Sequence, residues 1–158
     1  MRNIMVDLET MSTEPNAAII SIGAVKFGAT GLGQTFYRVV EFESSVNNGL
    51  SVNPSTVMWW MKQSDEARAQ FNTDDATHII RALYDFSRFV GDEVAQKEVK
   101  IWGNGSDFDN VILANAYRTL KMNAPWRYYN NRCYRTVKSL FSDVPIDRKG
   151  VYLSLIHI

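Results

Sequence analysis

The chain has 158 residues, the size of a single domain, of which 46% are hydrophobic and 22% are charged. These proportions are ordinary for a globular protein and exclude disordered and collagen-like classes. Lys and Arg together number 17, as do Asp and Glu, so the formal net charge is zero. This balance disfavours a protein that coats nucleic acid by bulk charge, but not an enzyme that grips a short strand with help from metal ions.

The single cysteine, Cys133, excludes a disulfide within the chain, as is typical of proteins from a reducing cytoplasm. We expect its thiol to pack as a small hydrophobic group. Asp7 and Glu9 interrupt the N-terminus before any apolar run long enough for a secretory signal. No stretch of about 18 apolar residues occurs, so we expect a cytoplasmic protein without a membrane span or a membrane partner.

Three strands are predicted at the start of the chain. Residues 3–10 alternate apolar and other side chains, residues 17–27 are rich in β-branched side chains, and residues 34–41 form a third strand. The glycine-rich residues 28–33 indicate a hairpin between the second and third of them. We therefore expect the fold to begin with three antiparallel strands.

Helices are predicted in the middle and at the end of the chain. Asn53 caps a short helix over 56–63, Ser64 caps another, and residues 75–92 form a longer amphipathic helix that includes His78. Further helices are expected over 107–120 and 135–141, with a short apolar strand over 99–103 between the longer ones. Strands first, then helices around a further strand, indicate an α/β layered fold with a mixed sheet.

Asp7 and Glu9 are the first candidate metal ligands. They lie two residues apart on the predicted strand 3–10, so their side chains project from the same face. Two like charges beside a core are costly unless a cation lies between them. The same spacing also fits the solvated face of an edge strand, and the pair alone does not decide between these interpretations.

A second cluster, residues 103–110, follows a predicted strand and opens the next helix. Its glycines permit sharp turns and close backbone approach. We expect Asp107 to cap the helix, because its position suits an N-cap, and Asp109 to supply a third carboxylate opposite Asp7 and Glu9. Capping by both acids of the cluster is the alternative interpretation.

The motif Asp-Leu-Glu-Thr at residues 7–10, followed by Asn-x-x-x-Phe-Asp at residues 104–109, resembles the DEDD exonucleases, the DnaQ-like branch of the ribonuclease H-like fold. The likeness is greatest to small phage and bacterial members, the exonuclease VIII-like and 3′→5′ exoribonuclease-like proteins. It covers nearly the whole chain, including residues 56–60 and Arg135. Each motif is weak alone, but both in this order, about a hundred residues apart, are fairly specific.

The resemblance implies a ribonuclease H-like three-layer α/β fold over residues 1–152, with a mixed sheet whose antiparallel N-terminal strands are flanked by helices. It also implies two divalent cations, Mg²⁺ or Mn²⁺, and makes Asp7, Glu9 and Asp109 both metal ligands and catalytic residues. Asp7 would bridge the ions, Glu9 would hold the one beside the attacking water, and Asp109 the one beside the leaving oxygen. The expected product is a nucleoside 5′-monophosphate.

The family also has a third motif near the C-terminus, His-x₄-Asp or Tyr-x₃-Asp, whose His or Tyr positions the attacking water. Neither form is complete here, because His157 precedes only Ile158 and Tyr152 is followed by Ile156 where the acid should stand. Residues 153–158 match the translation of a transposon end used in sequencing libraries, and we expect them to be a non-native tail. The exonuclease domain would then be incomplete, and its catalysis impaired.

Aromatic and basic side chains are candidates for holding a single-stranded 3′ end. Trp59 and Trp60 project about 100° apart on a helix, so we expect one ring to pack in the core and the other to face the substrate, unless both pack. Arg135 belongs to a basic, tyrosine-rich segment that suits phosphate and base contacts, or else forms a solvated face. The expected substrate-binding residues are Thr10, Met11, Trp59, Trp60, Asn104, Phe108 and Arg135.

The sequence does not distinguish an RNA substrate from a DNA substrate. A hypothesis of another class is a non-catalytic nucleic-acid-binding module that has kept the fold. The incomplete third motif favours this module if the C-terminus is natural. The three upstream acids favour the enzyme, because a pure binder has no need to keep buried acids together. A homodimer is a further expectation, since related small exonucleases are often dimers.

Overall fold

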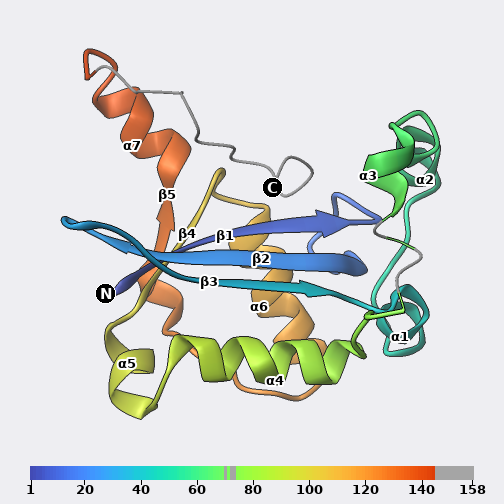
Figure 1. Ribbon diagram of the computed structural model, residues 1–158, viewed down its shortest axis with the longest axis horizontal. Coiled ribbons are helices and arrows are strands. Elements are labelled where there is room, and N and C mark those ends of the chain that lie inside the picture. The colour runs from blue at the N-terminus through green and yellow to red at the C-terminus, as the bar shows by residue number, and fades with distance from the viewer. Residues whose placement is uncertain (70, 72–73, 145–158) are drawn as a thin grey trace.

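The structure, a computed structural model, describes residues 1–69, 71 and 74–144 (Figure 1). In this part of the chain one mixed sheet has the strand order β3-β2-β1-β4-β5. The strands are β1 (Asn3–Thr10), β2 (Ile19–Gly28), β3 (Gly31–Val39), β4 (Lys100–Gly103) and β5 (Asn131–Cys133). Antiparallel pairing of β1 with β2 and of β2 with β3 confirms the predicted start of the fold, and β4 and β5 extend it in parallel.

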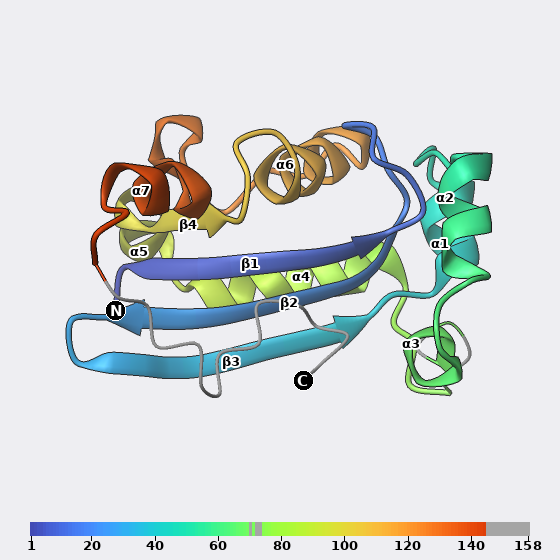
Figure 2. The same cartoon turned by 90° about the horizontal axis from the view of Figure 1, so that it is seen from above.

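Helices lie on both sides of this sheet. Figure 1 shows α4 on one side, while α7 and the α2–α3 pair rise on the other side at opposite ends, and Figure 2 shows α4 running beneath β1 and β2. The helices are α1 (Phe42–Asn47), α2 (Pro54–Trp60), α3 (Asp65–Ala69), α4 (Ile79–Val90), α5 (Glu93–Glu98), α6 (Asp109–Thr119), α7 (Tyr134–Leu140) and the 3₁₀ turn η1 (Tyr128–Asn130).

The core forms between the sheet and helices α4 and α6. Ile4, Val6 and Leu8 of β1 are at most 3% exposed, and the period of two along the strand turns the intervening residues to the other face. On α4, apolar residues spaced three and four apart make one buried face, which includes Leu83 and Phe86. The alternation of apolar residues with Asp7 and Glu9 predicted a central, buried strand, and β1 is the middle strand of the sheet.

The structure corrects one predicted helix boundary and the predicted packing of the cysteine, and it adds three short elements. The helix expected from residue 75 begins at Ile79, because His78 is its N-cap and its Nδ1 accepts a hydrogen bond from Ile80 N at 3.3 Å. The short elements α1, α5 and β5 were not predicted. Cys133 is half-buried, and its Sγ accepts the Thr136 amide at the start of α7 instead of packing in the core.

The C-terminal tail and the membrane span are the remaining expectations about the chain as a whole. Residues 153–158, together with Tyr152, lie outside the described residues, so the expectation of a non-native tail that carries His157 stays a prediction. Among the helices that the structure describes, we find none with the length and apolar character needed to cross a bilayer.

The buried Tyr117 joins α6 to α4, and its removal gives a test of the packing. Its hydroxyl donates to Leu83 O at 2.6 Å and lies 2.9 Å from Ser87 Oγ, and the side chain is only 1% exposed. Tyr117→Phe should lower the free energy of unfolding by about 1–2 kcal/mol, because Ser87 loses a buried partner. Urea denaturation measures this, with the exposed Tyr128→Phe as control; equal loss in both variants would contradict the assignment.

Candidate active site

Asp7 and Glu9 project from the face of β1 opposite to its core residues. They lie on an internal strand of the sheet, since β1 pairs with β2 on one side and with β4 on the other. Both residues are half-buried rather than solvated, which rules out the edge-strand interpretation of their spacing. The pairing of β1 with β2 shifts register between Glu9 and Thr10, so the strand becomes irregular where the acids end.

Asp109 approaches these acids from the first turn of α6. Its carboxylate accepts hydrogen bonds from Leu8 N at 3.1 Å and from Asn104 N at 3.3 Å, and the residue is buried. Because Leu8 stands between Asp7 and Glu9, this contact places the third acid beside the first two. Gly103 makes the approach possible, since a Cβ there would lie 3.0 Å from Asp109 Oδ2 and 2.7 Å from Asn110 Oδ1.

Asp107 does not cap α6, contrary to the sequence-based prediction. The helix begins at Asp109, its N-cap is Phe108, and that cap makes no side-chain hydrogen bond. The Asp107 side chain is exposed and lines a cavity instead. The prediction was wrong because it started the helix two residues too early, at the first acid of the cluster.

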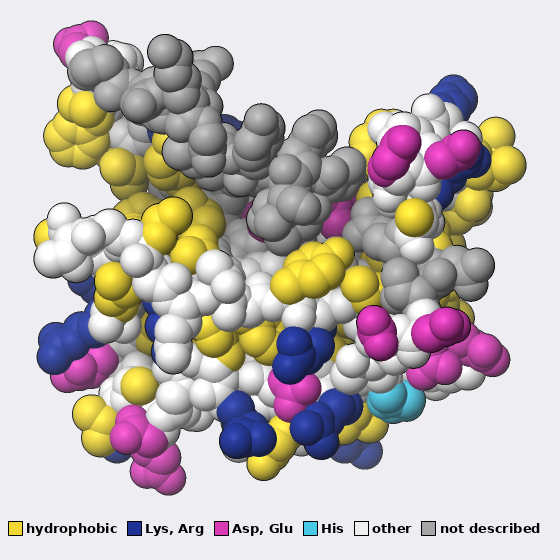
Figure 3. Space-filling view, viewed as in Figure 1, with side chains coloured by type: hydrophobic (Ala, Val, Ile, Leu, Met, Phe, Trp, Pro, Cys, Tyr) yellow, Lys and Arg dark blue, Asp and Glu magenta, His cyan; other side chains and the backbone are white. Residues whose placement is uncertain are grey.

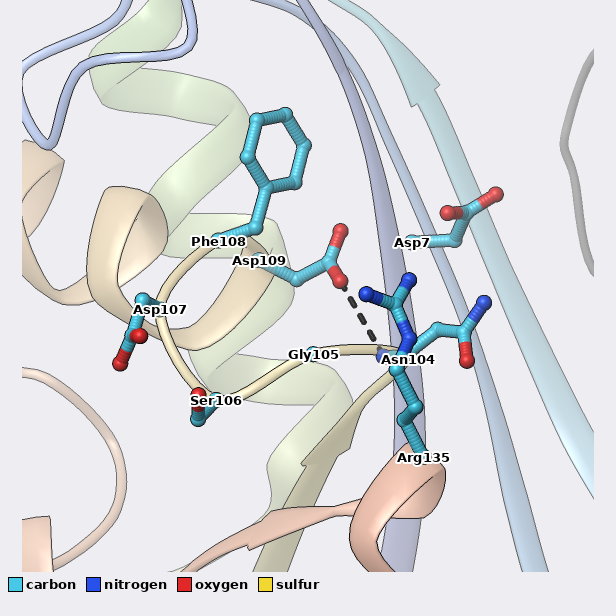
Figure 4. A pocket seen from close by; sticks show the side chains of 8 residues that line it. All are labelled: Asp7, Asn104, Gly105, Ser106, Asp107, Phe108, Asp109 and Arg135. Atoms are coloured by element: carbon cyan, nitrogen blue, oxygen red, sulfur yellow. Dashed lines mark hydrogen bonds between the residues drawn. The ribbon is translucent and has the colours of Figure 1, made fainter. Parts of the chain in front are cut away.

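A cavity of about 430 Å³ gathers five of the predicted site residues: Asp7, Asn104, Phe108, Asp109 and Arg135 (Figure 4). Ser106 and Asp107 also line it. Figure 4 shows the Arg135 side chain reaching in from α7 toward Asp109 and Asp7, while the Asp7 carboxylate points away from Asp109. The cavity thus presents acids, one guanidinium and the Phe108 ring to a common space.

The acids affect one another through their charges. Burial, and then the charges of Asp7 and Asp109, raise the pKa of Glu9 from 4.5 to about 7. Burial also raises the pKa of Asp109, although its two backbone hydrogen bonds and the Arg135 charge act in the opposite direction. Three neighbouring acids of which two resist ionisation form a site that a cation would stabilise.

The donor chemistry of this cluster fits a hard divalent cation. Mg²⁺ and Mn²⁺ prefer carboxylate oxygens, and a bound cation would offset the mutual repulsion of Asp7, Glu9 and Asp109. Within the ranges 1–69 and 74–144, however, no three His, Cys, Asp or Glu side chains are already close enough together to hold a metal. The orientation of Asp7 in Figure 4 agrees with this, and metal binding would require its carboxylate to turn toward Asp109.

The remaining predicted substrate residues lie at the end of β1 and on helix α2. Trp60 is buried, and its Nε1 donates to Thr10 O at 2.9 Å, so the ring supports the strand end rather than presenting a stacking face. Met11 is also buried. Trp59, which precedes Trp60 on α2, is 49% exposed. Of these two neighbouring rings on α2, Trp60 is therefore buried and Trp59 is open to solvent, as the 100° rotation predicts.

Tyr37 was not predicted as a site residue. Residue pairing places it across Gly23 from Asp7, on the sheet face that carries the acids. Burial raises the pKa of its phenol, a hydrogen bond with Ser21 opposes this, and the Glu9 charge raises it further. The strand alternation alone could not reveal this neighbour, because the register between strands was unknown.

The charge of Glu9 makes the metal-free protein sensitive to pH. Between pH 4.5 and about 7 the folded state holds more protons at Glu9 than the unfolded state, so stability falls as pH rises through this window. Glu9→Gln should therefore raise the free energy of unfolding at pH 8 by about 1–2 kcal/mol, after allowance for solvent screening, and change it little at pH 5.

Urea denaturation in EDTA at both pH values measures this effect. The exposed Glu14→Gln serves as the matched control, because it removes one acid without touching the cluster. A Glu9→Gln protein less stable than the wild type at pH 8 would contradict the assigned repulsion.

Comparison with known proteins agrees with this architecture. The family model described as "3'-5' exoribonuclease Rv2179c-like domain" matches residues 2–152. The exodeoxyribonuclease of Enterobacteria phage T4 is 24% identical over 165 residues, covering 86% of this chain and 70% of that protein.

Solved structures share the fold at low identity. E. coli Exonuclease I in complex with a dT13 oligonucleotide has a TM-score of 0.60 at 14% identity, over 95% of this chain and 31% of that one. The nuclease domain of 3′hExo, a DEDDh family member bound to rAMP, has a TM-score of 0.56 at 14% identity, over 90% of this chain and 71% of that one. This chain thus spans less than a third of Exonuclease I. The match over residues 2–152 shows that the chain belongs to the 3′-5′ exoribonuclease Rv2179c-like domain family, and its fold is the ribonuclease H-like fold of the DEDD exonucleases.

Proposed function

We propose that this chain is a 3′→5′ exonuclease that removes nucleoside 5′-monophosphates from single-stranded nucleic acid. The observation that carries the proposal is the hydrogen bond of 3.1 Å from Leu8 N to Asp109 Oδ1, because Leu8 lies between Asp7 and Glu9 on β1. Neighbouring buried acids destabilise the metal-free fold, and bound cations would offset their repulsion. Membership of the 3′-5′ exoribonuclease family supports the direction of attack.

Asp7, Glu9 and Asp109 would hold two divalent cations, Mg²⁺ or Mn²⁺. When bound, such a pair supplies an activated water and stabilises the charge on the leaving 3′ oxygen. The protein contributes orientation: the two backbone hydrogen bonds fix the Asp109 carboxylate, and β1 fixes the spacing of the other two acids. Asp7 lies two residues from Glu9 on β1 and lines the cavity together with Asp109, so after a turn of its carboxylate it would be the acid shared by both ions.

Arg135 is proposed to bind the phosphate of the terminal nucleotide. Its guanidinium lies in the cavity with Asp7 and Asp109, and a planar fork of donors suits phosphate oxygens. Phe108, which lines the same cavity, and the exposed Trp59 offer rings to bases. Asn104 lines the cavity as well, while Thr10, Met11 and Trp60 are proposed to shape the loop rather than to touch a base.

The relatives do not agree on whether the substrate is RNA or DNA. The family description names an exoribonuclease, the phage T4 relative is an exodeoxyribonuclease, and Exonuclease I was solved with DNA oligonucleotides. We therefore propose single-stranded ends as the substrate class and test both sugars. A homodimer, expected from the resemblance, remains a prediction.

The incomplete third motif limits the rate that we propose for these 158 residues. Neither His-x₄-Asp nor Tyr-x₃-Asp occurs in the sequence, and loss of a general base typically costs about 10²–10⁴-fold. A non-catalytic nucleic-acid-binding module is the second candidate function, and the missing motif favours it only if Ile158 is the natural C-terminus. The two candidates differ in whether completion of the motif creates turnover.

The activity test compares the 158-residue chain with a version extended to the stop codon of its gene. Single-stranded RNA and DNA labelled at the 5′ or the 3′ end are incubated with Mg²⁺ or Mn²⁺, and mononucleotide release is followed. Asp7→Asn should reduce the rate about 100-fold or more, because a ligand shared by both metals is lost. The exposed Asp74→Asn is the control.

Three outcomes separate the candidates. Metal-dependent release from the 3′ end that depends on Asp7 establishes the exonuclease. Strand binding without turnover in the extended chain supports the binding module instead. Turnover that is unchanged in Asp7→Asn defeats the proposed site.

Arg135→Lys gives a separate test of the phosphate contact. Lysine keeps the positive charge but lacks the planar fork, so kcat/KM should fall about tenfold, mainly through a higher KM. Steady-state kinetics on a labelled oligonucleotide measure the change, with Lys138→Gln as control, since Lys138 lies on the same helix but does not line the cavity. Unchanged kinetics in Arg135→Lys would exclude bidentate phosphate binding.

A further inference from the structure

A separate groove of about 530 Å³ runs between the edge strand β3 and helix α4. It shares no lining residue with the cavity around Asp109. Lys26 pairs with the core residue Ile4, whereas Asp7 pairs with Gly23, so the groove lies on the sheet face opposite to the acids. Nothing in the catalytic arrangement uses this groove.

Positive charge predominates in and around the groove. Asp85 is the acid that lines it, and this carboxylate pairs with both Arg38 Nε at 3.3 Å and Arg81 Nε at 2.9 Å. Lys26 and Arg88 also line it, and neither makes an ion pair within the described residues. Figure 3 shows Lys and Arg side chains gathered around an acidic one over β3 and α4.

Aromatic rings lie next to these cations. Lys26 Nζ lies 4.8 Å from the centroid of the Phe89 ring, and the Arg38 guanidinium carbon 5.2 Å from that of Phe36. These contacts hold the cations along the groove wall rather than leaving them free in solvent. With a formal net charge of zero for the chain, the excess of positive charge is a local feature of this surface.

We propose that the β3–α4 groove binds the phosphodiester backbone of a single-stranded nucleic acid, upstream of the 3′ end. The identity of this strand rests on the proposed exonuclease function. A row of cations with rings beside it suits successive phosphates better than one compact anion. Strand β3 lies two strand spacings from β1, about 10 Å, so a strand that leaves the acids reaches the β3 edge within a few nucleotides.

The test removes two charges from the groove and two from elsewhere. Lys26→Gln/Arg88→Gln leaves the Asp85 ion pairs intact, and Lys62→Gln/Lys100→Gln removes two exposed cations that line neither cavity. Fluorescence anisotropy with a labelled strand of about 20 nucleotides, in EDTA to prevent cleavage, measures the affinity over a salt range of about 50–200 mM.

The groove variant should bind the long strand on the order of tenfold more weakly at low salt. Its salt slope should fall by about 1.4, which is about 0.7 for each of the two phosphates that the variant no longer neutralises. A dinucleotide, too short to reach both surfaces, should bind less than about twofold more weakly. Arg88→Gln alone, at an exposed position, should lower the slope by about 0.7 and keeps the test valid if the double variant folds poorly.

Failure of the groove and failure of the exonuclease give different results. If the wild type binds and degrades the strand but both double variants match it, the groove proposal is overturned and the exonuclease stands. If binding depends on the groove but no strand is degraded, the groove stands alone. A change of sedimentation with unchanged nucleic-acid affinity would make the groove a protein interface, and absence of any strand binding by the wild type would also overturn the proposal.

Discussion

The hydrogen bond from Leu8 N to the Asp109 carboxylate joins two parts of the chain that are 101 residues apart. It lies between Asp7 and Glu9, so it fixes the start of α6 against the very stretch of β1 that carries the other acids. The second bond, from Asn104 N, ties the same carboxylate to the loop after β4. Strand β1, the loop after β4 and helix α6 therefore meet at the Asp109 side chain, which lines the cavity.

The proposed metal binding and the stability of the metal-free fold place opposite demands on these acids. A buried Asp109 and a Glu9 whose pKa is raised to about 7 both favour the neutral acid, whereas metal ligation needs the carboxylate. The protein limits the conflict by donating two backbone hydrogen bonds to Asp109 and by placing Arg135 nearby. Backbone amides of β1 and of the loop after β4 thus fix the Asp109 carboxylate, whereas the Asp7 carboxylate points away from it.

The sequence predicts those parts of the fold that local patterns determine. Alternation identified β1 and its acid-bearing face, and the antiparallel start followed from the glycine-rich turn at residues 28–33. Asp107 misled the assignment of the helix start, because capping propensity is local while the tertiary bonds of Asp109 decide where α6 begins. Tyr37 was missed because its position beside the acids depends on strand register, which no single-strand pattern contains.

The parallel pairing of β1 with β4 has a consequence for the order of events during synthesis. Asn3 pairs with Lys100, and Leu8 N donates to Asp109, so β1 stays without these partners until about a hundred further residues have been translated. At the usual pace of translation, that delay is about 5–20 s. The β1–β2–β3 meander can form in the meantime, but the acid cluster cannot assemble on a nascent chain that has not yet reached α6.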